Sequence, residues 1–146
     1  MGVDMYYFAY GSNMNREQMK KRCPTGRFLK RARLLGYKFV YDGHSSMRNG
    51  AVANIIKSEN GTVWGVIFEI DDECIKNLDR YEGFPRSYQR RCVGVDDEGG
   101  NTYQAVVYLR KPQEIGKPSD EYRDILLEGA RDCGLPESYI KDFLKL

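Results

Sequence analysis

Residues 7–13, Tyr-Phe-Ala-Tyr-Gly-Ser-Asn, decide how the chain begins to fold. The apolar and aromatic start favours a β-strand, and the Gly-Ser-Asn end is typical of a turn or helix cap. Asn15 and Gln18 have the spacing of a capping box, which predicts a helix from here. A strand, a turn and a helix start in succession leave backbone N–H groups unpaired, and these suit a carboxylate or an oxyanion. An ordinary strand-to-helix turn that binds nothing has the same local pattern.

The composition is that of a folded globular chain. The 146 residues fit a single domain, 1–146, with 41% hydrophobic and 30% charged residues. The net charge of +2 does not point to nucleic acid, and we interpret the basic clusters at 20–22 and 90–91 as solvated faces. No apolar run is long enough to cross a membrane, so we expect no membrane partner.

The cysteines give no metal signature. They show no C-x-x-C spacing and stand at Cys23, Cys74, Cys92 and Cys133. His44 is the only histidine, so we expect no zinc site. The start Met1–Tyr6 lacks a basic region followed by an apolar one, which predicts no leader and a cytoplasmic protein. Reduced thiols are then expected, with two disulfides as the alternative.

Hydrophobic periodicity and turn residues predict strands alternating with inserted helices. We expect strands at 28–41, 51–56, 62–70, 88–96 and 102–109, besides the apolar start of 7–13, and helices at 15–22, 71–82, 119–132 and 137–144. Asn60-Gly61 predicts a hairpin, Gly36 a bulge or bend, and 42–50 a polar loop. Hairpin-linked strands with helices between them indicate an α+β domain with a mixed, largely antiparallel sheet that a barrel could close.

Glu82 is the acid that this pattern singles out. It follows Leu78 by four residues, so it shares the apolar face of the predicted helix, and Gly83 ends that helix. Burial and the negative end of the helix dipole both raise a carboxyl pKa, which suits a general acid or base. Alternatively, Glu82 forms a salt bridge with one of the arginines at 86, 90 and 91 and only supports the fold. A Ser–His–Asp triad does not fit, because Ser12 has no evident histidine partner.

The chain resembles the gamma-glutamylcyclotransferase family over nearly its whole length. The resemblance begins with residues 7–13 and continues with Val63-Trp64-Gly65-Val66 and Leu78-Asp79-Arg80-Tyr81-Glu82-Gly83. It ends with Pro118-Ser119-Asp120-Glu121-Tyr122, Gly129-Ala130, Gly134-Leu135-Pro136 and Tyr139. It implies an α+β fold in which helices flank a small, mixed, mainly antiparallel β-barrel.

The same resemblance implies the site. Glu82 matches the family's catalytic glutamate, and no metal or organic cofactor is implied. The residues implied to bind substrate are Tyr7, Phe8, Ala9, Tyr10, Gly11, Ser12, Asn13, Tyr88 and Tyr122.

The implied reaction is the conversion of a small-molecule γ-glutamyl amine to 5-oxoproline and a free amine, chemistry that belongs to glutathione metabolism. Glu82 acts as general acid and base while the substrate's own α-amino group attacks its γ-carbonyl. The leaving amine stays open between an amino acid, a lysine side chain, a dipeptide and an aminoglycoside-linked chain. The loops 42–50 and 111–116 carry no readable pattern, and the oligomeric state stays open. A non-catalytic module that binds a small ligand on the same scaffold is the alternative function.

Overall fold

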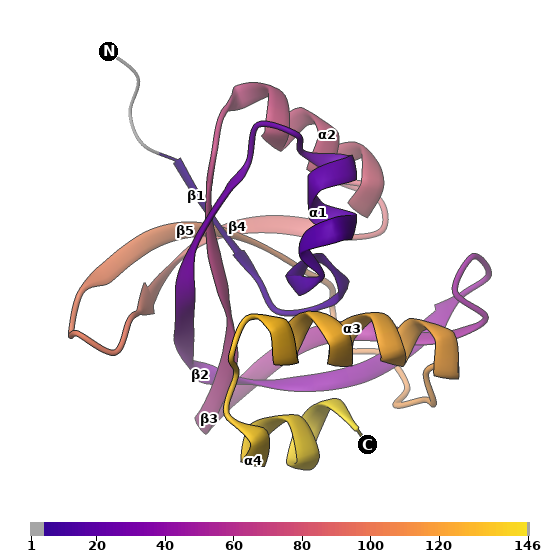
Figure 1. The fold of residues 1–146 in the computed structure, drawn as a ribbon. Coiled ribbons are helices and arrows are strands. Elements are labelled where there is room, and N and C mark those ends of the chain that lie inside the picture. Colours follow the sequence, from indigo (N-terminus) through magenta and orange to yellow (C-terminus); the bar gives the residue numbers. More distant parts are fainter. Residues whose placement is uncertain (1–4, 146) are drawn as a thin grey trace.

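A computed structural model describes residues 5–145 (Figure 1). Residues 1–4 and residue 146 lie outside the described part. The prediction that the chain has no leader depends mostly on residues 1–4, so it falls outside the described residues. The strands are β1 (Met5–Ala9), β2 (Arg27–Ser45), β3 (Gly50–Ile70), β4 (Gln89–Asp96) and β5 (Thr102–Leu109). The helices are α1 (Arg16–Arg22), α2 (Asp72–Glu82), α3 (Asp120–Asp132) and α4 (Glu137–Tyr139), with single helical turns at Ser12–Met14 and Ile140–Leu144.

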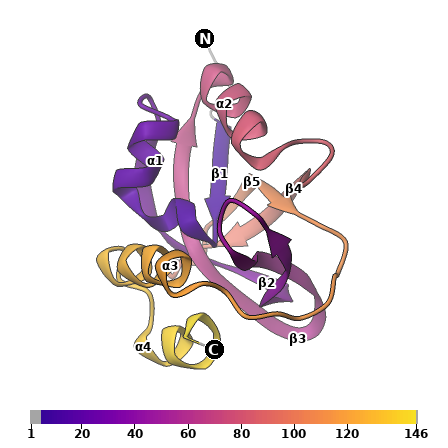
Figure 2. The same ribbon diagram turned by 90° about the vertical axis from the view of Figure 1, so that its right-hand side faces the viewer.

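The five strands close into a barrel in the order β1-β3-β2-β4-β5. Among the strand pairs of residues 5–145, β1–β5 alone is parallel, so the mixed, mainly antiparallel α+β barrel is confirmed. Figures 1 and 2 show α1 and α2 side by side at one end of the barrel, with α3 and α4 together beside the other end. The chain passes from β1 through a tight turn into α1 at the place where the two pairs of helices approach each other.

The helix caps form as their residue types predict. Asn15 accepts a hydrogen bond from the Gln18 N–H at 3.2 Å, and Gly83 ends α2 in the left-handed conformation with a φ of 66°. Gly129 of α3 lets the turn before α1 approach, because a Cβ there would lie 2.4 Å from the Asn15 nitrogen. The turn at 11–15 is thus clamped between the barrel and α3.

The predicted hairpin at Asn60-Gly61 is wrong. β3 is one strand from Gly50 to Ile70 and pairs with β2 on both sides of this dipeptide. Residues 58–61 bulge instead opposite Gly36, whose φ of 85° confirms the predicted irregularity there. Gly61 is needed for close approach, since a Cβ would lie 2.3 Å from the Tyr37 carbonyl oxygen. Asn60-Gly61 therefore lies in a bulge rather than in a hairpin turn, because the pairing of β3 with β2 continues on both sides of this dipeptide.

The polar loop predicted at 42–50 is shorter than expected. β2 runs on to Ser45, and only residues 46–49 form the turn before β3. Buried Asp42 holds this extension of β2 in the barrel, because Arg110, which directly follows β5, pairs with its carboxylate at 2.7 Å. The side chain of Asn54 on β3 donates to the same carboxylate at 3.0 Å.

The expectation of four reduced thiols is also wrong. Cys23, just after α1, forms a disulfide with Cys74 in the first turn of α2, with the Cα atoms 5.1 Å apart. Cys92 and Cys133 are free. The two cysteines are 51 residues apart in the sequence, and they come close together only because α1 and α2 pack against each other.

Candidate active site

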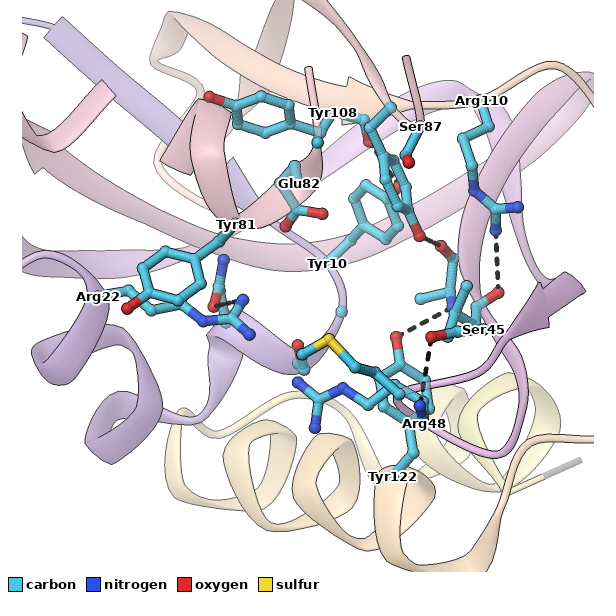
Figure 3. Close-up of a pocket in the computed structure, with 18 of the residues that line it drawn as sticks. Tyr10, Arg22, Ser45, Arg48, Tyr81, Glu82, Ser87, Tyr108, Arg110 and Tyr122 are labelled. Carbon is cyan, nitrogen blue, oxygen red and sulfur yellow. Dashed lines mark hydrogen bonds between the residues drawn. The ribbon is translucent and has the colours of Figure 1, made fainter. Parts of the chain in front are cut away.

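A cavity of about 370 Å³ opens where the turn after β1 meets the end of α2, the end of β2 with the turn that follows it, and the start of α3 (Figure 3). It brings together most of the residues selected from the sequence. Those that line it are Tyr7, Tyr10, Gly11, Ser12, Asn13, Glu82, Tyr88 and Tyr122. Phe8 and Ala9 do not line it: they are 0% and 1% exposed and belong to the hydrophobic core.

Glu82 is the last residue of α2, and its carboxylate extends into the cavity (Figure 3). It is half-buried, and burial raises its pKa above the ordinary carboxyl value, while the charges of Arg22, Arg48 and Arg110 partly oppose that rise. Within residues 5–145 the carboxylate takes part in no salt bridge. Arg90, one of its three suggested partners, pairs with Asp79 instead.

The turn at 11–13 presents main-chain donors. In the described part of the chain, no hydrogen bond uses the N–H of Gly11, Ser12 or Asn13. The Asn13 side chain fixes the turn, because its amide donates to the Tyr7 hydroxyl at 3.0 Å. Its oxygen accepts from Gln18 at 2.9 Å and from Arg22 at 3.1 Å. The donors are therefore held in place before any ligand binds.

Two tyrosines of the cavity wall meet at the backbone of Ala53. The Tyr122 hydroxyl accepts a hydrogen bond from the Ala53 N–H at 3.0 Å, whereas the Tyr88 hydroxyl donates to the Ala53 carbonyl at 2.6 Å. Burial raises the pKa of Tyr122 to about 12, so the phenol stays protonated at neutral pH. Tyr122 therefore keeps its own proton for a further hydrogen bond, while Tyr88 has already used its proton.

Sequence reasoning missed the arginines of the site. Arg22 belongs to a basic cluster that we interpreted as solvated, yet it turns inward to Asn13 and lies 4.6 Å from the centre of the Tyr81 ring. Arg48 lies in the unassigned 42–50 segment, and Arg110 precedes the unassigned 111–116 segment. No local pattern distinguishes an arginine that faces a cavity from one that faces water.

Nothing in residues 5–145 forms a group of three or more His, Cys, Asp or Glu side chains that could hold a metal ion. The same residues contain no helix both long and apolar enough to cross a membrane.

Comparisons with known proteins agree on one family. Residues 62–143 match the model of the AIG2-like family. The chain is 33% identical to gamma-glutamylcyclotransferase of Mus musculus, over 94% of this chain and 76% of that protein. It is also 33% identical to gamma-glutamylcyclotransferase of Homo sapiens, over 91% of this chain and 73% of that protein.

The solved structures extend the likeness to the fold. One titled gamma-glutamyl cyclotransferase superimposes with a TM-score of 0.92 at 31% identity, covering 98% of this chain and 87% of the other. YkqA of Bacillus subtilis gives a TM-score of 0.79 at 25% identity, over 96% of this chain and 52% of the other. With the fold and the sequence identity in agreement, this chain belongs to the gamma-glutamylcyclotransferase family.

Proposed function

We propose that this protein is a cyclotransferase that converts a small γ-glutamyl amine to 5-oxoproline and the free amine. Family membership supports a cyclotransferase enzyme in general. The observation that carries the specific reaction is that Glu82, with its raised pKa, shares one cavity with the unpaired amides at 11–13. We also propose that the whole chain is one domain, since the barrel and its helices share a single core.

Glu82 moves the protons in this proposal. Its carboxylate takes a proton from the α-ammonium group of the substrate, and the freed amine nitrogen attacks the γ-carbonyl carbon. A C–N bond forms and closes the five-membered ring, leaving a tetrahedral intermediate with a negative oxygen. Glu82 then returns the proton to the departing nitrogen, and the original amide C–N bond breaks as the carbonyl re-forms. The ring nitrogen, positively charged after the attack, loses a second proton through Glu82 to the released amine, which leaves as an ammonium ion. No water is consumed, and a pKa raised toward neutrality suits both transfers.

The oxyanion needs preorganised donors. The N–H groups of Gly11, Ser12 and Asn13 have no hydrogen-bond partner within residues 5–145, and the Tyr122 hydroxyl has a proton to donate. Such donors stabilise the developing charge without reorganising during the reaction. The Asn13 contacts to Tyr7, Gln18 and Arg22 keep the turn rigid.

Cyclisation also needs no nucleophilic side chain from the protein. The amine and the carbonyl belong to one molecule, so the cavity mainly has to hold the substrate in its folded conformer. Alignment of this kind contributes several kcal/mol, with roughly 7–11 kcal/mol as the extreme.

The test is 5-oxoproline release from a panel of γ-glutamyl amines, comparing the wild-type protein with Glu82→Gln. We expect loss of the general base to lower kcat by about 10²- to 10⁴-fold, with the fold unchanged by circular dichroism. Glu73→Gln is the matched control, because Glu73 is exposed in the first turn of the same helix. Full activity of Glu82→Gln would remove this residue from the mechanism. Tight calorimetric binding without turnover would favour a binding module instead.

A further inference from the structure

We propose that Asp79 is a positioning residue for the reaction: its carboxylate holds the last turn of α2 on the barrel, so that Glu82 faces the donor turn at 11–13. This inference rests on the proposed function and adds to it a residue that acts through Glu82. Among residues 5–145, those that line the cavity do not include Asp79, so it has no part in binding substrate.

The Glu82 side chain has no anchor of its own. Within residues 5–145 its carboxylate takes part in no salt bridge and accepts no hydrogen bond. The position of this carboxylate therefore depends on the backbone at the end of α2 and on what fixes that backbone to the barrel. Among the side chains of residues 79–82, Asp79 is the one that forms hydrogen bonds with strands in the described part of the chain.

Two neighbouring strands hold the Asp79 carboxylate. The Tyr108 hydroxyl of β5 donates to one of its oxygens at 2.6 Å, and the Arg90 guanidinium of β4 donates to the other. Arg90 and Tyr108 lie opposite each other in the β4–β5 ladder, so their side chains leave the sheet on the same side. One cross-strand pair of the barrel therefore converges on one carboxylate of α2.

Tyr108 also supports the strand that leads into the donor turn. Its backbone carbonyl accepts a hydrogen bond at 2.5 Å from the hydroxyl of Tyr10, which directly precedes that turn. The Tyr108 ring packs edge-on against Tyr7, with the ring centres 5.9 Å apart, and the Tyr7 hydroxyl accepts from Asn13. Tyr10, Tyr108 and Glu82 all line the cavity (Figure 3). β5 is therefore a common support for the acid and for the main-chain donors.

The hydrogen bond from Tyr108 is the contact that we expect to fix the helix. Tyr108 is 3% exposed, and burial, followed by the hydrogen bond to Asp79, raises the pKa of its phenol, which therefore keeps the proton that it donates. A hydroxyl that donates to a carboxylate forms a short and strong hydrogen bond. Arg90 is exposed, so water and salt weaken its ion pair with Asp79.

The test measures kcat and KM for 5-oxoproline release from the γ-glutamyl amine that the wild type converts fastest. Asp79→Leu keeps the approximate size of the side chain but removes both acceptor oxygens. We expect it to lower kcat by about 10²-fold because Glu82 is misplaced, and to change KM by less than about threefold. Asp79→Asn keeps an acceptor for Tyr108 and should stay within about fivefold of the wild-type kcat. Asp72→Leu is the matched control, because Asp72 is exposed in the first turn of the same helix, and it should keep the wild-type kcat.

Tyr108→Phe removes the same hydrogen bond from the other side and decides the question if Asp79→Leu does not fold. It should lower kcat by about 10-fold or more, again with little change in KM. Arg90→Gln removes the exposed ion pair and leaves the Tyr108 bond in place, so its kcat should fall by about fivefold or less. Equal effects of Tyr108→Phe and Arg90→Gln, or a wild-type kcat in Tyr108→Phe, would overturn the inference.

Combining Asp79→Leu with Glu82→Gln separates positioning from a general weakening of the fold. Because Asp79 acts through Glu82, Asp79→Leu should lower the kcat of Glu82→Gln protein by less than about twofold. A fall in kcat as large as that in the wild-type background would show that Asp79 supports the fold and not Glu82 in particular.

Hydrogen exchange separates failure of this inference from failure of the proposed function, because it needs no turnover. Asp79→Leu and Tyr108→Phe should speed amide exchange in the last turn of α2, at residues 80–83, more than in the first turn, whereas Asp72→Leu should not. If the wild type forms no 5-oxoproline but exchange changes in this way, Asp79 holds the end of α2 and the proposed reaction is wrong. Unchanged exchange at residues 80–83 in both variants would reject the role of Asp79 whatever the reaction.

Discussion

The Tyr122 hydroxyl oxygen lies 3.0 Å from the backbone nitrogen of Ala53 and accepts its hydrogen bond. Because the N–H group of Ala53 supplies this proton, the phenolic proton of Tyr122 stays free to point at a ligand. Tyr88 reaches the same residue with the opposite polarity, since it donates to the Ala53 carbonyl. Two neighbouring tyrosines of one cavity therefore differ in what they can offer a substrate.

Tyr122→Phe should lower kcat/KM for 5-oxoproline release by roughly 10- to 100-fold, because one oxyanion donor is lost. Tyr88→Phe is the matched variant: each change leaves one backbone group of Ala53 unpaired and should cost about 1–3 kcal/mol of stability. Only Tyr122→Phe also removes a donor to the substrate. Steady-state kinetics and urea unfolding on both variants check this. Equal losses of activity would show that Tyr122 acts only through the fold.

The pH profile should report the raised pKa of Glu82. As a base Glu82 must be ionised, so kcat/KM falls as the pH drops through its pKa, and the midpoint should lie above the ordinary carboxyl value. Arg22→Gln removes a charge that opposes the rise, so the midpoint should move further up. A profile with an unshifted midpoint, or an Arg22→Gln midpoint that moves down, would contradict the environment described for Glu82.

Glu82→Gln should make the protein more stable at neutral pH while lowering kcat by about 10²- to 10⁴-fold. A carboxyl whose pKa is raised by folding contributes stability below its unfolded pKa, and this contribution is lost as the pH rises through the folded pKa. Glutamine keeps the shape of the side chain but carries no charge that burial would desolvate. The melting temperature of Glu82→Gln should therefore exceed that of the wild type above the folded pKa of Glu82, and the difference should vanish below its unfolded pKa. Thermal melts of both proteins across pH test this, and a neutral-pH melt lower than wild type would contradict it.

The Cys23–Cys74 disulfide should stabilise the fold by about 2–4 kcal/mol, because it closes a long loop in the unfolded chain. Replacing both cysteines with serine should lower the free energy of unfolding by that amount, measured with urea. The exposed Cys92→Ser should change it by less than about 0.5 kcal/mol. Denatured protein without reductant should show reactive thiols only at Cys92 and Cys133. Four reactive thiols under those conditions would contradict the pairing.

Gly61→Ala should destabilise the protein more than Gly36→Ala. At Gly61 a Cβ would lie 2.3 Å from the Tyr37 carbonyl oxygen, so the backbone has to shift at a cost of about 3 kcal/mol or more. At Gly36 no atom lies within 4 Å of such a Cβ, and only the φ of 85° opposes alanine, at roughly 1–2 kcal/mol. Urea unfolding of the two variants compares them directly. The reverse order would mean that β2 and β3 do not approach closely there.

Much of the local structure is readable from the chain alone. Asn15, Ser119 and Gly83 cap helices where their side chains or conformational freedom predict, and residues 7–13 mark the strand and turn. Their signals depend on neighbours within four residues, so sequence suffices. Glu82 is found by the same means, since its place follows from helical spacing and from the glycine that ends α2.

Other features needed partners far along the chain. Asn60-Gly61 forms a bulge rather than a hairpin because β2, more than twenty positions earlier, pairs on both of its sides. Cys23 meets Cys74 only because α1 and α2 pack together.

The sequence by itself determined the cap residues, the turn and the acid at the end of α2, because each is encoded by adjacent residues. Tertiary structure alone decided that Arg22, Arg48 and Arg110 surround that acid and that Ala53 holds two tyrosines in opposite polarity. These contacts form when the barrel closes and the helices pack on it. They join residues that are far apart in the sequence, so no local sequence pattern predicts them.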